Sequence, residues 1–129
     1  MPIEGLQAVL FDLDGTLADT APDLGHAANR LLVECGHPPL PLTTLRPYTS
    51  QGVRGLLHVS FGIGPADANY AALAERFLAF YAERLCEDTR LFDGIPALLD
   101  RLEASGIAWG IVTNKRERFT NPLMRLLEL

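Results

Sequence analysis

Residues 8–20, AVLFDLDGTLADT, place two aspartates one residue apart directly behind a run of four apolar residues. Continuous apolar runs are typical of strands in a parallel sheet that is covered on both faces, so we expect a strand over Gln7–Phe11. Asp12 and Asp14 then follow at its carboxyl end, where α/β sheets bind their ligands. Two carboxylates so close repel each other unless a proton or a cation lies between them, which indicates a functional use.

A second apolar run, Ile107–Val112, predicts another strand of the same kind, and a turn that contains Thr113 and Asn114 follows it. Two apolar strands separated by helical patterns are typical of a parallel α/β sheet. If the two strands are neighbours, these polar residues and the two aspartates meet at one edge of the sheet.

Between the two strands the apolar residues recur at helical spacing. The insert is far longer than the dozen or so residues that a crossover needs, so we expect it to form a helical module over the strand ends. The segment 37–52 is rich in proline and predicts a loop around a short turn. Helices are expected over Pro22–Gly36, Gln51–Phe61, Asp67–Glu87 and Ile95–Ala104, with a last helix that starts at Asn121–Pro122.

The net charge of the 129 residues is −5. Because no basic stripe is present to neutralise phosphates, we expect no nucleic-acid partner. No signal-like leader is visible and no apolar run approaches the roughly 18 residues that span a bilayer, so we expect no membrane partner and a cytoplasmic location. A small anionic substrate stays compatible with this charge, since a metal ion or oriented amides reverse the field locally.

The order Asp-Leu-Asp-Gly-Thr favours phosphate chemistry. Side chains at positions i and i+2 lie on the same side, so Asp12 and Asp14 would approach one pocket. Mg²⁺ would relieve their repulsion, and it uses one or two carboxylates plus substrate phosphate oxygens. Gly15 lets the backbone turn so that its N–H groups form an anion-binding nest. One aspartate can then act as nucleophile and the other as general acid/base, with the Thr113 hydroxyl donating to a phosphoryl oxygen.

The stretch LFDLDGTLADT (10–20) resembles the first motif of the haloacid dehalogenase (HAD) superfamily of phosphatases, hxDxDGTLxDS/T, and IAWGIVTN (107–114) resembles the second. The run RLFDGIPALLDRLEASGIAWGIVTNK, with TAPD and the loop at 50–54, is similar to the phosphoglycolate phosphatase group, and within it to N-acetylmuramic acid 6-phosphate phosphatases. The resemblance covers the whole chain. It implies a doubly wound parallel sheet, incomplete here, with an inserted α-helical cap: a core of residues 1–18 and 92–129 and a cap of residues 19–91.

The resemblance also implies an activity, that of an Mg²⁺-dependent phosphomonoesterase working through an aspartyl-phosphate. The substrate would be a small phosphorylated metabolite, with N-acetylmuramate 6-phosphate and 2-phosphoglycolate leading. It makes Asp12 the nucleophile and a metal ligand through its carboxylate, and Asp14 the general acid/base and a metal ligand through its main-chain carbonyl. Arg54 either reaches the substrate from the cap or is a solvated arginine. The predicted phosphate- or substrate-binding residues are Gly15, Thr16, Arg54, Thr113 and Asn114.

The family carries two further motifs after the second: a lysine that steadies the nucleophile and the phosphate, and an acidic pair that completes the Mg²⁺ shell. Beyond Thr113 the acids are Glu117 and Glu128, and we interpret Lys115 as a solvated residue without a third-motif role.

The chain is therefore expected to be an N-terminal fragment of a phosphatase, or to complete its two-stranded sheet with another chain, as a dimer or by strand exchange. Two alternatives stay open. One is a catalytically incomplete chain that binds Mg²⁺ or phosphate without turnover, and the other is a sugar-phosphate mutase of the same superfamily.

Overall fold

Two short strands pair in parallel and carry the polar ends that the sequence predicts. In the computed structural model, which describes residues 5–129, β1 (Ala8–Phe11) pairs with β4 (Ala108–Ile111). Ala8 lies opposite Ala108 and Phe11 opposite Ile111. The predicted parallel α/β arrangement is confirmed. The helices are α1 (Ala21–Glu34), α2 (Leu42–Leu45), α3 (Gly52–Phe61), α4 (Tyr70–Glu83), α5 (Ile95–Ala104) and α6 (Glu117–Leu126), with a 3₁₀ helix η1 (Arg46–Gln51).

Helix α6 departs from the prediction. We expected it to start at Asn121–Pro122, but it begins at Glu117 and holds Pro122 in its interior. An interior proline removes one helical hydrogen bond and costs about 3 kcal/mol. The burial of Phe119 and Leu123 on the inner face of the helix offsets this cost. The proline-rich segment also differs, since it forms α2 and η1 where we expected a loop around a short turn.

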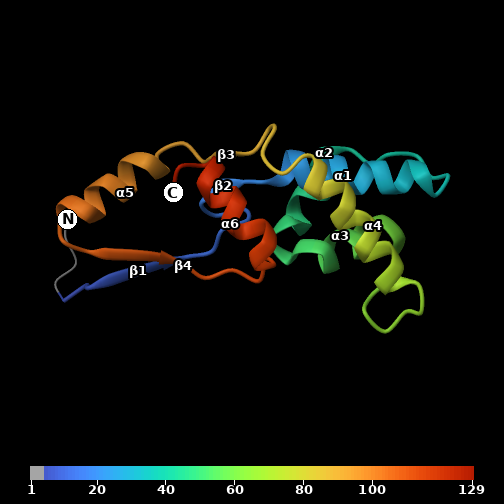
Figure 1. Ribbon diagram of the computed structural model, residues 1–129, viewed down its shortest axis with the longest axis horizontal. Coiled ribbons are helices and arrows are strands. Elements are labelled where there is room, and N and C mark those ends of the chain that lie inside the picture. The colour runs from blue at the N-terminus through green and yellow to red at the C-terminus, as the bar shows by residue number, and fades with distance from the viewer. Residues whose placement is uncertain (1–4) are drawn as a thin grey trace.

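The helices α1 to α4 gather at one end of the molecule, the β1/β4 sheet and α5 lie at the other, and α6 lies between them (Figure 1). Helix α6 belongs to both hydrophobic clusters, because Phe119 joins the one among α1 to α4 and Leu123 joins the one at the first strand's end. The first cluster is built on Leu24, Ala27, Leu31, Leu45, Leu56, Leu57, Phe77 and Tyr81, and the second on Leu13, Leu17, Ala18 and Leu123.

A second, two-stranded ribbon joins these two parts of the chain. In it, β2 (Ala18–Asp19) pairs antiparallel with β3 (Arg90–Leu91). This ribbon is not predicted from the sequence, because strands of two residues are too short to show a periodic pattern. The predicted boundaries between core and cap, at 18/19 and 91/92, fall at this ribbon, and the division into two domains itself stays a prediction.

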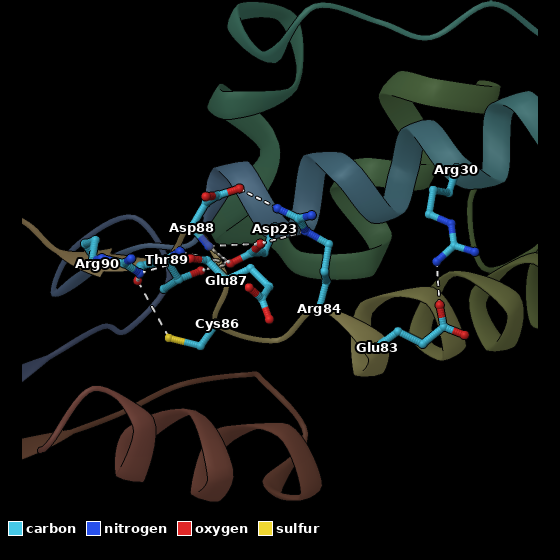
Figure 2. Close-up of polar contacts among 9 residues, drawn as sticks. All are labelled: Asp23, Arg30, Glu83, Arg84, Cys86, Glu87, Asp88, Thr89 and Arg90. Carbon is cyan, nitrogen blue, oxygen red and sulfur yellow. Dashed lines mark hydrogen bonds and ion pairs between the residues drawn. The ribbon is translucent and has the colours of Figure 1, made fainter.

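A buried carboxylate fastens the same junction. Asp23 in the first turn of α1 is fully buried. It accepts hydrogen bonds from the main-chain N–H groups of Asp88 and Thr89, at 3.0 and 2.9 Å, and from the Thr89 hydroxyl at 2.7 Å. The Arg84 Nε lies 3.4 Å from its other oxygen. Figure 2 shows these groups converging on Asp23, which ties the start of α1 to the segment that returns from α4.

The backbone of η1 packs closely against the start of α3. A Cβ atom on Gly55 would lie 2.7 Å from the carbonyl oxygen of Tyr48, so only a glycine lets η1 pack this closely on α3. This packing fixes residues 50–54 beside the carboxyl ends of the strands, where Ser50 lies next to Gly15.

Part of the sheet surface is apolar and exposed. The side chains of Leu10 and Val112 are 69% and 61% exposed, and within residues 5–129 β1 pairs with β4 alone. Unpaired strand edges and exposed apolar faces favour pairing with a further strand. The pairing with another chain or segment stays a prediction. Among the described residues, no helix has the length and apolar character that a membrane span needs.

The Asp23 contacts predict a large effect of a small substitution. Asp23→Asn replaces one accepting oxygen by an NH₂ group that faces donors, so we expect it to lower the free energy of unfolding by about 2–4 kcal/mol. Glu83→Gln, which weakens the exposed ion pair between Arg30 and Glu83 drawn in Figure 2, should cost less than about 1 kcal/mol. Urea denaturation measures both, and equal costs would contradict a special role of Asp23.

Candidate active site

A cavity of about 260 Å³ lies at the carboxyl ends of the two parallel strands. Its lining comes from four parts of the chain: Asp14 after β1, the turn 113–116 after β4, Phe119 of α6, and the helical insert. The insert contributes residues 50–54 and one face of α4. Polar groups therefore come from the strand ends and from residues 50–54 of the insert, whereas the face of α4 is mostly apolar or aromatic.

Four of the predicted site residues share this lining. Asp14, Thr113 and Asn114 come from the strand ends, and Arg54 reaches the cavity from the first turn of α3. Arg54 is exposed and has no ion-pair partner within the described part of the chain. The structure thus brings these residues together as the strand-end argument predicts, and their binding roles stay predictions.

The other three predicted residues, Asp12, Gly15 and Thr16, are exposed and lie outside the lining. One carboxylate oxygen of Asp12 accepts the N–H of Leu13 at 2.9 Å. Gly15 has a φ of 81°, so the turn does require glycine there. Its N–H, however, donates to the Ala18 carbonyl at 2.9 Å, and the N–H of Thr16 donates to the Leu13 carbonyl at 3.3 Å. The loop's own carbonyls thus take up two N–H groups that the expected anion-binding nest would use, and the phosphate-binding roles of Gly15 and Thr16 stay predictions.

An ion pair occupies the floor of the cavity. The Asp14 side chain is 9% exposed, and its Oδ1 accepts hydrogen bonds from the Thr20 hydroxyl at 2.7 Å and from the Lys115 Nζ at 2.9 Å. Burial lowers the pKa of the Lys115 ammonium, and the neighbouring Asp14 charge opposes that shift. Both donors bind Oδ1, which leaves Oδ2 of Asp14 for other partners.

The interpretation of Lys115 as a solvated residue is wrong. Its side chain is 7% exposed, because the chain turns back after β4 through a hydrogen bond from the Lys115 N–H to the Thr113 hydroxyl at 3.1 Å. Sequence reasoning missed this residue although two signals were present. Lys115 is the only lysine of the chain, and it lies four residues past the end of β4, the strand whose end meets the aspartate loop.

The aromatic ring of Tyr81, on α4, contacts the lysine of this ion pair. The Lys115 Nζ lies 4.6 Å from the ring centroid, and Tyr81 is 1% exposed. Its hydroxyl is buried and finds no hydrogen-bond partner among residues 5–129. Burial, and next the nearby charge of Asp14, raise the pKa of this phenol far above its usual range. Sequence periodicity predicts Tyr81 only as a core residue of the helix.

The acidic groups present limit how a metal ion could be held. Within residues 5–129, no three histidine, cysteine, aspartate or glutamate side chains gather as a metal cluster. The Asp14 carboxylate is already neutralised by Lys115, whereas the Asp12 carboxylate is exposed. Mg²⁺ commonly keeps several waters and binds through one or two carboxylates plus phosphate oxygens. The Asp12 carboxylate with the main-chain carbonyl of Asp14 fits that donor chemistry.

Several known proteins are similar to this chain in sequence. A family model described as haloacid dehalogenase-like hydrolase matches residues 9–129. A phosphoglycolate phosphatase of Xanthomonas campestris pv. campestris is 49% identical over 111 residues, which make up 86% of this chain and 50% of that protein. An N-acetylmuramic acid 6-phosphate phosphatase of Pseudomonas aeruginosa is 40% identical over 122 residues, 95% of this chain and 54% of that protein. The chain thus spans about half the length of the curated relatives it matches.

Solved structures share the fold. A haloacid dehalogenase-like family hydrolase from Streptococcus pneumoniae superposes with a TM-score of 0.82 at 22% identity, covering 98% of this chain and 58% of its own. An HAD hydrolase of family IA from Entamoeba histolytica gives a TM-score of 0.73 at 22% identity, covering 96% and 56%. The HAD-like fold class and the family resemblance are confirmed.

The buried ion pair predicts a measurable coupling. Lys115→Met leaves the Asp14 carboxylate buried with only Thr20 as donor, so we expect it to lower the free energy of unfolding by about 3 kcal/mol. Adding Asp14→Asn removes the stranded charge and should restore about 1–2 kcal/mol. Urea denaturation of both single variants and the double variant measures the coupling.

A matched control tests a more exposed pair at the same turn. Arg116→Met disrupts the Arg116–Glu75 contact of 3.5 Å, whose side chains are 55% and 67% exposed, and should cost less than about 1 kcal/mol. Costs of Lys115→Met and Asp14→Asn that simply add would show that the two side chains do not interact.

Proposed function

Because this chain belongs to the haloacid dehalogenase-like hydrolase family, we propose that the whole protein is an Mg²⁺-dependent phosphomonoesterase acting on a small phosphorylated metabolite. The observation that carries the proposal is the meeting of Asp14, Thr113 and Arg54 in one cavity at the carboxyl ends of β1 and β4. The names of the relatives, which are phosphatases of small phosphorylated compounds, support the same reaction class. A cytoplasmic location belongs to the same proposal.

In the proposed first step, Asp12 acts as the nucleophile. Its Oδ1 is held by the N–H of Leu13, so Oδ2 is available to attack phosphorus. A bond forms between Oδ2 and phosphorus while the bond from phosphorus to the alcohol oxygen breaks, which gives an aspartyl-phosphate. Mg²⁺, when bound, supplies positive charge beside the transferring phosphoryl group.

Asp14 transfers the protons. It gives a proton to the departing alcohol oxygen and later takes one from the water that attacks the aspartyl-phosphate, so that inorganic phosphate leaves and the Asp12 carboxylate is restored. Thr20 and Lys115 hold Oδ1 of Asp14, which fixes the carboxyl group while Oδ2 carries the proton. The Thr113 hydroxyl is available at the same edge to donate to a phosphoryl oxygen.

Arg54 supports a substrate whose alcohol part is anionic. Its guanidinium reaches the cavity from the helical insert, and a guanidinium binds carboxylates and phosphates through paired hydrogen bonds. The two leading substrates, 2-phosphoglycolate and N-acetylmuramate 6-phosphate, both carry a carboxylate in that part. The proposed role of Arg54 is therefore recognition of the leaving alcohol rather than of the transferring phosphoryl group.

The nucleophile is tested first. Asp12→Asn should lower the kcat of magnesium-dependent phosphate release from an aryl phosphate by roughly 10³-fold or more in the whole protein, because the substituted side chain cannot be phosphorylated. Asp100→Asn, an exposed acid on α5, should leave kcat within about twofold. Turnover by Asp12→Asn close to that of the unchanged protein, or turnover that chelation of magnesium does not affect, would refute the mechanism.

Arg54 gives a separate prediction about the substrate. Arg54→Gln should raise KM for 2-phosphoglycolate about tenfold or more, since it removes a charged partner worth about 1.4 kcal/mol or more. KM for an aryl phosphate whose aryl group is uncharged should stay within about twofold. Arg101→Gln on α5 is the matched control. Steady-state phosphate release measures KM for both substrates in the unchanged protein and in both variants, and an equal rise of KM for both substrates in Arg54→Gln would assign Arg54 to the phosphoryl group instead.

A further inference from the structure

We propose that Tyr81 on α4 is a positioning residue for Asp14, because its aromatic ring holds the Lys115 ammonium against the Asp14 carboxylate. The inference rests on the proposed function, in which Asp14 transfers the protons. Tyr81 itself does not touch the reacting atoms in this assignment. It acts through Lys115, which contacts both the ring and the carboxylate.

The contacts of one nitrogen atom join the helical insert to the strand end. The Lys115 Nζ is 4.6 Å from the centroid of the Tyr81 ring and 2.9 Å from Oδ1 of Asp14. The lysine and aspartate side chains are 7% and 9% exposed, so little water is available to solvate either charge. A desolvated ammonium is attracted strongly to an aromatic face, whose quadrupole is negative.

Neighbouring aromatic rings fix the position of this face. Phe77, one turn earlier on α4, stacks against Tyr81 with centroids 6.4 Å apart. Phe119, from α6, lies at 5.5 Å and is tilted by 45°. All three side chains are buried, so two neighbouring rings pack against Tyr81 and restrict its position while Lys115 contacts the ring.

A positioning role explains why an ammonium is buried here at all. The Lys115 side chain is 7% exposed, and an ammonium that loses its hydration needs neighbours that compensate its charge. Asp14 supplies the opposite charge and Tyr81 supplies the negative ring face, and both contact the same nitrogen. If the ring is removed, water can solvate the Lys115 ammonium or the lysine side chain can adopt another rotamer. The Asp14 carboxylate then loses its fixed orientation.

The only lysine of the chain makes the contact directly observable. In the 129-residue chain labelled with ¹⁵N,¹³C-lysine, Lys115 gives a single side-chain set of NMR signals. Its terminal CH₂ and NH₃⁺ signals should lie upfield because they face an aromatic ring, and Tyr81→Leu should remove that shift. Tyr81→Phe should keep it, since the ring remains.

Phe80→Leu is the matched control for the loss of an aromatic ring from α4. Phe80 is also buried and also carries cations over its ring, with Arg30 and Arg76 at 4.2 and 4.3 Å, but it lies outside the cavity lining. The substitution Phe80→Leu should therefore leave the chemical shifts of the Lys115 signals unchanged. Signals of Lys115 that are the same in the unchanged chain and in Tyr81→Leu would overturn the proposal, whatever the activity.

Kinetics in the whole protein decide the consequence for catalysis. Tyr81→Leu should lower kcat for an aryl phosphate about tenfold while KM stays within about twofold, because proton transfer and not binding is affected. Tyr81→Phe and Phe80→Leu should stay within about threefold of the unchanged kcat. Tyr81→Phe that loses as much kcat as Tyr81→Leu would assign the effect to the hydroxyl and refute the role of the ring.

Two further outcomes separate this inference from the proposed function. Equal losses of kcat in Tyr81→Leu and Phe80→Leu would refute a specific role of Tyr81 in an otherwise active phosphatase. No phosphate release by the unchanged protein, together with an upfield Lys115 signal that Tyr81→Leu abolishes, would refute the phosphatase while the contact between Tyr81 and Lys115 stands.

Discussion

The parallel pairing of β1 with β4 is the constraint on which the site depends. Parallel neighbours end at the same edge of a sheet, so residues that follow the two strands meet however long the chain between them is. Asp14 and Lys115 lie 101 residues apart in the sequence and 2.9 Å apart in space for this reason. The helical insert can form a cover above this edge because the β2/β3 ribbon and the Asp23 contacts bring its two ends together.

Local patterns were sufficient to predict the elements and much of the cavity. The apolar runs identify both strands to within a residue or two, and the predicted helix over Ile95–Ala104 has the same bounds in the structure. The rule that ligands bind at the carboxyl ends of parallel strands placed Asp14, Thr113 and Asn114 together before any coordinates were considered. These features depend on neighbours in the sequence or on one general property of sheets.

The features that sequence reasoning missed depend on contacts between distant residues. Lys115 resembles an ordinary solvated lysine until its partner, far away in the chain, is known. The interior position of Pro122 depends on buried contacts of Phe119 and Leu123 that local helix propensity does not contain. The N–H groups of the aspartate loop were expected to face a phosphate, but the carbonyl of Ala18 accepts one of them once β2 forms.

The burial of the single lysine has a practical consequence for chemical probing. Apart from the α-amino group, Lys115 carries the one primary amine of the chain, and the folded structure keeps it almost completely from solvent. Acylating reagents that label ordinary surface lysines should therefore modify this side chain only when the aromatic cover lifts or the chain unfolds. The rate of its acylation would record how often that opening occurs, without any introduced probe.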